Sequence, residues 1–470
     1  MHKWWPLVAV CLGTFLFLLD TTVLIVALPD IASGLNVQAS VLPWVVDVYT
    51  LVLAVLMLTV GAVADRYGAR TVYLVGLAVF GAASLACGLA PNVGVLITAR
   101  GVQGVGGAAM AVTALALLGS GYRGPDLGRA MGVFGAVTGL AAAVGPVLGG
   151  VVTQYASWRA VFFLNLPLVA VTAALSRRVL PVPTGRRTAG ARIDLPGALA
   201  FALCAGSLTY ALSLPGESHR TPGGVLGLSA VVGIALAVFV RVELRSPAPL
   251  LDLRLFARAS FSAVLTCVVA ATAAFAALVY TSIWLQSGLR LGPVRAGLAL
   301  LPLALASFVT SLVTGRRLHG RSPRAVLGTG LLLSGTGCAL QAGLGADSSA
   351  ASLAAGLVLT GVGVGLLGPA TGAAVFAALP PERAGAAAGV MTTFRQLGQT
   401  LGVAAFGVLF RRGGGEPFEG LERVLVAAAA AGLLGAVLAF VFAPRAVPRA
   451  EPVAPAEPGA APAPTPARPR

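Results

Sequence analysis

Four ionisable side chains lie inside long apolar runs of this 470-residue chain. They are two acids, Asp20 and Asp47, and two bases, Arg100 and Arg395. A charged side chain inside a membrane-spanning helix costs about 2.5–3.5 kcal/mol on insertion scales, so such residues mark ion pathways, substrate sites and proton relays. These residues predict the binding and release of protons or of a charged substrate, and we expect no catalytic residue.

Three of the four residues share one depth. Counted from the outer ends of their runs, Asp20 is about eight residues deep, Asp47 about five and Arg100 about seven, or about 8–12 Å at ~1.5 Å per residue. We therefore expect them to meet in one layer. One arginine facing two acids leaves one carboxylate free to exchange a proton or to bind a cation.

Structural interpretations of the same residues stay open. Asp20 and Arg100 could form an ion pair that only holds two helices together. Asp47 is close enough to the interface to be hydrated. Arg395 has no acid in its own half of the chain, so it either donates to neighbouring carbonyls or lies in a cavity, where it anchors an anionic substrate or closes a gate.

The composition shows what surrounds these residues. The chain is 57% hydrophobic and 10% charged, against roughly 25% charged in a soluble domain. Its formal charge is +16, but the basic residues form small clusters between apolar runs and not the continuous basic surface of a nucleic-acid-binding protein. These features exclude an ordinary soluble enzyme and a disordered chain, and they predict an integral membrane protein without a nucleic-acid partner.

A spanning helix needs about 20 mostly apolar residues, and fourteen runs approach this length. We expect an all-α integral membrane protein with 14 transmembrane helices, at residues 6–28, 42–62, 71–90, 93–117, 130–152, 160–176, 195–214, 222–240, 261–284, 294–314, 325–345, 351–378, 385–409 and 424–443.

The loops predict orientation and symmetry. Most of the 32 basic residues fall in alternate loops on one side, which places both termini in the cytoplasm. Residues 61–70 (GAVADRYGAR) and 315–324 (GRRLHGRSPR) follow similar spans, and repeated halves are typical of transporters.

This repeat predicts four parts of the chain. They are an N-terminal six-helix bundle at 1–176, a basic loop with two inserted helices at 177–258, a C-terminal six-helix bundle at 259–443 and a disordered cytoplasmic tail at 444–470.

Glycine and proline form a second signal, because small residues let membrane helices approach closely. The stretch RGVQGVGGA places Gln103 and Gly107 on one helical stripe with Arg100, and Gly104 lies beside them. The stretch GPVLGG interrupts a run with a proline flanked by glycines. It predicts close helix packing, and it also suggests a bend point.

Several of these stretches resemble the major facilitator superfamily, and within it the fourteen-span drug:proton antiporters. The loop at 61–70 resembles the superfamily signature. The stretch LDTTVLIVALP resembles the first-span motif of the fourteen-span group, WRAVFFLNLP resembles the start of its sixth span, and RQLGQTLGVA resembles its thirteenth span. The residues that carry the resemblance include Gly61, Asp65, Arg66, Gly68 and Arg70 in the loop, Arg100, Gln103, Gly104 and Gly107 in the fourth span, and Gly145, Pro146, Gly149 and Gly150 in the antiporter motif of the fifth.

The resemblance implies export of hydrophobic drugs by two halves that rock about a central cavity, in exchange for protons. Protonation of Asp20 is then expected to weaken its pairing with Arg100. Asp65, Arg66 and Arg70 are expected to latch the cytoplasmic ends of the helices in the outward-facing state. Two departures stand out: Ile25 occupies a position that is usually asparagine, and the second-half spans contain no further acid.

Other chemistry has little support in the sequence. All five cysteines lie in apolar runs without metal-ligand spacing, and the Gly-x-Gly-x-x-Gly match at 363–368 lacks a preceding strand. We expect no metal, no cofactor and no enzymatic activity. The expected partners are a small hydrophobic substrate, protons and membrane lipid, with the chain a monomer in the inner membrane of a high-GC bacterium. The alternative is a dedicated exporter of one self-made, possibly anionic, metabolite.

Overall fold

The computed structural model describes residues 3–36, 41, 43–181, 194–213, 222–246, 249, 251, 253–257, 259–317, 321–343, 348–378, 384–411 and 417–443. Its regular elements are all helical. They are α1 (Trp5–Leu35), α2 (Pro43–Tyr67), α3 (Ala69–Gly88), α4 (Val93–Gly121), α5 (Gly124–Tyr155), α6 (Trp158–Phe163), α7 (Asn165–Val179), α8 (Leu195–Ser213), α9 (Pro222–Arg245), η1 (Leu253–Ala257), α10 (Ala259–Ser287), α11 (Pro293–Arg317), α12 (Pro323–Ala342), η2 (Ala350–Leu353), α13 (Ala354–Ala378), α14 (Ala384–Arg411) and α15 (Pro417–Phe442).

Each of the fourteen predicted runs overlaps a helix, and the sixth run is split at Leu164 into α6 and α7. Within the described residues, eleven helices are long and apolar enough to cross a membrane, and α8 contributes a shorter apolar stretch, Pro196–Leu208. The prediction of an all-helical membrane protein is confirmed. The number of crossings, fourteen, stays a prediction.

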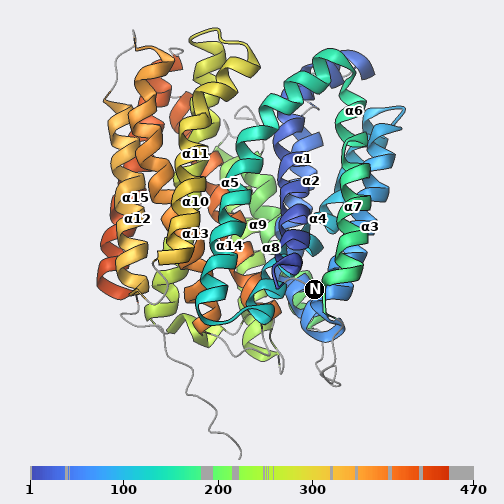
Figure 1. Cartoon of the computed structure of the whole chain (residues 1–470), viewed down its shortest axis with the longest axis vertical. Coiled ribbons are helices and arrows are strands. Elements are labelled where there is room, and N and C mark those ends of the chain that lie inside the picture. Colours follow the sequence, from blue (N-terminus) through green and yellow to red (C-terminus); the bar gives the residue numbers. More distant parts are fainter. Residues whose placement is uncertain are drawn as a thin grey trace, which may run out of the picture.

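The helices form two groups that lie side by side (Figure 1). In one group α4 packs on α2 and α3, and α1 packs on α5; in the other, α12 packs on α13 and α15, and α10 packs on α14. Helices α8 and α9 pack on each other, and α8 also packs on α2. The boundaries expected at 176, 258 and 443 stay predictions, and the expected tail at 444–470 lies outside the described residues.

Among the described residues, the main contacts between the groups are those of α5 with α11, α2 with α14, α4 with α14 and α5 with α13. The first of these, between α5 and α11, is the most extensive. The hydroxyl of Ser311 on α11 donates a hydrogen bond to the carbonyl of Gly132 on α5, 2.9 Å away. A Cβ added at Gly132 would lie 2.7 Å from the Ser311 carbonyl oxygen and 3.0 Å from Cα of Gly315. The absence of side chains on these glycines therefore allows the two backbones to touch.

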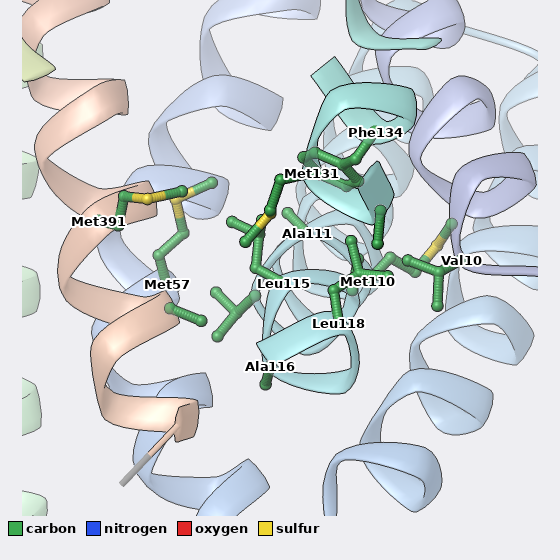
Figure 2. Close-up of a cluster of buried hydrophobic side chains, with 14 of the residues drawn as sticks. Val10, Met57, Met110, Ala111, Leu115, Ala116, Leu118, Met131, Phe134 and Met391 are labelled. Atoms are coloured by element: carbon green, nitrogen blue, oxygen red, sulfur yellow. The ribbon is translucent and has the colours of Figure 1, made fainter. Parts of the chain in front are cut away.

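The second pair is α2 with α14. A Cβ added at Gly389 would lie 3.2 Å from the Met57 carbonyl oxygen and 3.5 Å from Cα of Gly61. Met57, Met131 and Met391 are all buried in the same apolar cluster, and Figure 2 shows the side chains of Met57 and Met391 turned toward each other. Methionine is flexible and adapts to irregular gaps, so this contact can repack when the two helices shift.

The start of α1 is fixed against the connection between α4 and α5. Lys3 forms an ion pair with Asp126, and the ring of Trp4 stacks on that of Tyr122 with centroids 5.4 Å apart. The Tyr122 hydroxyl donates to the Lys3 carbonyl at 3.0 Å and accepts from the Leu7 amide at 3.2 Å. The N-terminus and the α4–α5 connection therefore lie at the same end of the molecule.

Candidate functional site

The structure brings Asp20 and Arg100 together in the interior of the first helix group. Asp20 is on α1 and Arg100 on α4, and Arg100 Nη1 donates to Asp20 Oδ2 at 2.5 Å. Neither side chain has exposed surface. A buried ion pair needs further hydrogen bonds to offset the loss of hydration of both charges, and the surrounding side chains provide them.

Two amides hold the second carboxylate oxygen. Gln103 Nε2 donates to Asp20 Oδ1 at 2.9 Å, and Asn165 Nδ2 donates to the same oxygen at 2.6 Å. Both amides also reach the hydroxyl of Ser84, at 2.9 and 3.3 Å, and Gln103 Oε1 accepts from Arg100 Nη1 at 2.6 Å. The carboxylate of Asp20 thus joins α1 to α4 and α7, and Ser84 adds α3 to the network through the two amides.

The rest of the Arg100 guanidinium faces α2. Its Nε donates to the Val45 carbonyl at 3.0 Å, and its Cζ lies 4.2 Å from the centroid of the Tyr49 ring, within the range of a cation–π interaction. Its Nη2 is buried and has no hydrogen-bond partner among the described residues. Arg100 therefore links α4 to α1 and α2, and both N–H donors of its Nη2 are unused among the described residues.

This arrangement couples the charge of one carboxyl group to helix packing. Ionised Asp20 accepts from Arg100, Gln103 and Asn165. A proton on the carboxyl would leave the arginine charge uncompensated in a fully buried site, where electrostatic interactions are strong. The charge on Asp20 is thus tied to the packing of α1 against α4 and α7, and a role of this residue in proton coupling stays a prediction.

Asn165 and Ser84 were not among the predicted site residues. Asn165 is the first residue of α7, directly after the break at Leu164, and it is buried. Ser84 also donates to the Phe80 carbonyl at 2.8 Å, as serine does in any apolar helix. The signal that could have identified Asn165 is an amide inside an apolar run, because such side chains hydrogen-bond between membrane helices.

The other two charged residues of the prediction are placed only in part. Asp47 belongs to α2, but its side chain lies outside the described part of the structure, so the expected three-residue layer is described only for Asp20 and Arg100. Arg395 is half-buried on α14, and it has no ion pair among the described side chains. Both interpretations of Arg395 stay open.

The predicted latch lies in the turn from α2 to α3. Gly68 has φ +90°, a conformation that favours glycine, and it allows the chain to reverse. Arg70 Nη2 donates to the Arg177 carbonyl at 2.7 Å, in the last turn of α7. Asp65 is half-buried and Arg66 is exposed. These contacts connect helices of one group, and a role in latching stays a prediction.

The fourth-span glycines pack against α2. A Cβ added at Gly104 would lie 2.8 Å from the Tyr49 carbonyl oxygen, and one at Gly107 would lie 2.8 Å from the Tyr49 hydroxyl. These glycines therefore hold the ring of Tyr49 close to α4, where it covers Arg100.

The fifth-span glycines pack against α1 and α11. A Cβ at Gly145 would overlap the hydroxyl of Thr22, and one at Gly149 would lie 2.7 Å from the Val23 carbonyl oxygen. Gly150 faces α11 instead. Helix α5 continues through this motif, and the side chain of Pro146 lies outside the described set. The motif thus positions the part of α1 that follows Asp20, while a bend there stays a prediction.

Among the described residues two further acids are buried, near the start of α8 and the end of α9. Asp194 Oδ1 accepts from the Gly197 amide at 2.8 Å, which caps the start of α8. Glu243 Oε2 accepts from the Leu251 amide at 3.3 Å. These carboxylates satisfy backbone donors, so we interpret both as structural.

Comparisons with known proteins place these features in a family. The Major Facilitator Superfamily model matches residues 10–324 and 317–469. The chain is 36% identical over 409 residues to the multidrug resistance protein Stp of Mycobacterium tuberculosis, covering 85% of this chain and 74% of that protein. It is 38% identical over 413 residues to the puromycin resistance protein pur8 of Streptomyces alboniger, covering 86% and 81%.

A solved structure shows the same fold. The human organic anion transporter MFSD10 (TETRAN) superimposes with a TM-score of 0.70 at 16% identity, over 93% of this chain and 100% of that one. The family model, which matches most of the sequence, and these relatives agree with this fold. The chain belongs to the major facilitator superfamily.

Proposed function

We propose that this protein is a secondary active exporter that moves hydrophobic drugs or antibiotics across the cytoplasmic membrane in antiport with protons. The observation that carries the proposal is the buried carboxylate of Asp20 on α1, which is paired with Arg100 and accepts further hydrogen bonds from α4 and α7. The relatives Stp and pur8, which are named for drug resistance, support the substrate class.

The proposed cycle is alternating access. A proton on Asp20 releases Arg100 and loosens α1 from α4 and α7, and loss of the proton restores the network. The halves separate along the α5–α11 and α2–α14 contacts, with Asp65, Arg66 and Arg70 closing one end in the outward-facing state. No cofactor takes part, because the proton gradient supplies the energy.

The proposal includes the predicted topology. Fourteen crossings place both termini in the cytoplasm. The six-helix halves are residues 1–176 and 259–443, the inserted helices lie within 177–258, and the working unit is a monomer. Cysteine accessibility from either side of the membrane, at Lys3→Cys and at Arg290→Cys, tests this orientation, since the two positions are expected on opposite faces.

The test of the function is efflux from proteoliposomes with an imposed proton gradient and puromycin as the probe. We expect gradient-driven movement of puromycin by the unmodified protein and its loss in Asp20→Asn. The control is Glu419→Gln, which removes an exposed acid at the start of α15 and is expected to leave efflux unchanged. Intact efflux in Asp20→Asn contradicts the coupling role of Asp20.

A dedicated exporter of one self-made metabolite is the second candidate. Two observations favour an anionic metabolite: Arg395 has no ion pair within the described part of the chain, and Arg100 Nη2 has no hydrogen-bond partner there. The relative pur8 is named for resistance to a single antibiotic. A growth-inhibition profile over cationic, neutral and anionic drugs in a pump-deficient host separates the candidates, because a dedicated exporter protects against few of them.

A further inference from the structure

An apolar cavity lies where the inserted helices meet the two helix groups. Its volume is about 190 Å³, and its walls come from α2, α8, α9 and α14 together with Leu251. Of the lining residues, only Cys204 and Thr393 carry a heteroatom in the side chain, and the surface that the walls present to the cavity is apolar. None of the residues assigned to proton coupling lines it, so the cavity is separate from the site around Asp20.

The walls indicate what the cavity can hold. An apolar cavity of roughly 150 Å³ accepts a molecule the size of benzene, so 190 Å³ has room for one ring and a small substituent. Three phenylalanines line it, and the rings of Phe201 and Phe239 are tilted by 57° with centroids 5.3 Å apart. Aromatic rings favour tilted and edge-to-face partners at such distances, which favours an aromatic occupant.

The hydroxyl of Thr393, at the cavity wall, needs a hydrogen-bond partner. Thr393 is 2% exposed, and its hydroxyl has no hydrogen-bond partner among the described residues. The adjacent Thr392 donates to the Ala388 carbonyl at 2.7 Å, as threonines in apolar helices usually do. A buried hydroxyl without a partner is unfavourable. Threonine occupies two side-chain rotamers in helices, so rotation can exchange its methyl and hydroxyl groups at the cavity wall.

The cavity borders the outer surface of α9. Leu236, which lines it, is 50% exposed, and α9 has other exposed apolar side chains such as Ile234 and Val238. A surface of this kind on a membrane protein faces lipid. An apolar compound dissolved in the membrane therefore reaches the cavity without passing through water.

We propose that this cavity binds a single aromatic ring carrying one hydrogen-bonding group, with the ring packed against the phenylalanines and the polar group on the Thr393 hydroxyl after rotation of that side chain. The proposal concerns binding in the absence of a gradient. Its failure is therefore distinguishable from the failure of the proposed antiport.

The test is photolabelling of the full-length protein in nanodiscs with 4-azidoacetophenone, followed by peptide mapping. Unlabelled acetophenone and toluene serve as competitors with the same ring, and only acetophenone has an acceptor. Thr393→Val removes the hydroxyl and keeps the shape. Thr392→Val is the matched control for the loss of a threonine hydroxyl from α14. Ala205→Leu fills the cavity, and Cys204→Leu replaces it as the filling variant if Ala205→Leu is not monodisperse.

We expect labelled peptides from α8, α9 or α14, and saturable competition by acetophenone. Thr393→Val is expected to raise the half-saturating acetophenone concentration about five-fold, the loss of one hydrogen bond, and Thr392→Val to leave it unchanged. The filling variants are expected to lose the saturable labelling. The proposal is overturned if acetophenone and toluene compete equally and Thr393→Val does not change this, because the cavity then accepts any hydrocarbon, lipid chains included. It is also overturned if labelling persists in a monodisperse variant with a filled cavity.

Discussion

The carboxylate of Asp20 and the guanidinium of Arg100 form an ion pair at 2.5 Å although the two residues are 80 positions apart in the chain. Both groups are buried, so each compensates a charge that would otherwise be isolated. The pair has a structural consequence that does not depend on transport.

Removing one partner is expected to destabilise the protein more than removing both. Asp20→Asn or Arg100→Gln leaves an uncompensated group, a loss of about 3–5 kcal/mol for buried pairs in general. The double variant leaves two neutral amides and is expected to recover part of this loss. The measurement is the melting temperature in detergent, followed by size exclusion. Additive losses in the double variant contradict a mutual dependence of the two side chains.

Asn165 is expected to matter because it donates to the ionised form of Asp20. A hydrogen bond to a charged group contributes about 1.5–3 kcal/mol, so Asn165→Ala is expected to lower proton-driven puromycin efflux several-fold in protein that remains monodisperse. The control is Asn92→Ala, which removes the cap of α4 far from the carboxylate. If both variants lower efflux equally, Asn165 acts only through general stability.

Two neighbouring glycines of α5 are expected to respond differently to the same substitution. A Cβ at Gly149 meets the backbone carbonyl of Val23 at 2.7 Å, whereas one at Gly150 meets only a methyl group of Val294 at 3.3 Å. Backbone cannot yield as a side-chain methyl can, so Gly149→Ala is expected to cost about 1–3 kcal/mol and Gly150→Ala much less. Melting temperatures of the two variants test this, and equal values contradict the α1–α5 contact.

The proximity of Asp20 and Arg100 could be predicted because the helix rise fixes how deep a residue lies once the ends of an apolar run are known. The other members of the network could not. Whether Asn165 faces Asp20 depends on the rotation of α7, and the break at Leu164 that sets this rotation lies inside a continuous apolar run.

The same limit applies to the fold. Apolar runs predicted where the helices are, because each run needs about the thickness of the membrane. They could not predict that α5 packs on α11 and α2 on α14, since 60 glycines offer many faces for close approach. The cavity beside Thr393 also escaped prediction, because the inserted helices carry no sequence signal for the helices they contact.

The contact between Met57 and Met391 provides a direct test of movement between the helix groups. In a background with the five native cysteines replaced by alanine, Met57→Cys and Met391→Cys together place two thiols at the α2–α14 contact (Figure 2). A reducible ethane-bridged bis-methanethiosulfonate is expected to link them and to lower efflux at least ten-fold, because linked helices cannot separate. Each single variant treated in the same way is the control, and reduction is expected to restore efflux. A linked double variant that exports as fast as the single variants would show that this contact stays closed throughout the cycle, and the halves would then have to move about α2 and α14 as a hinge.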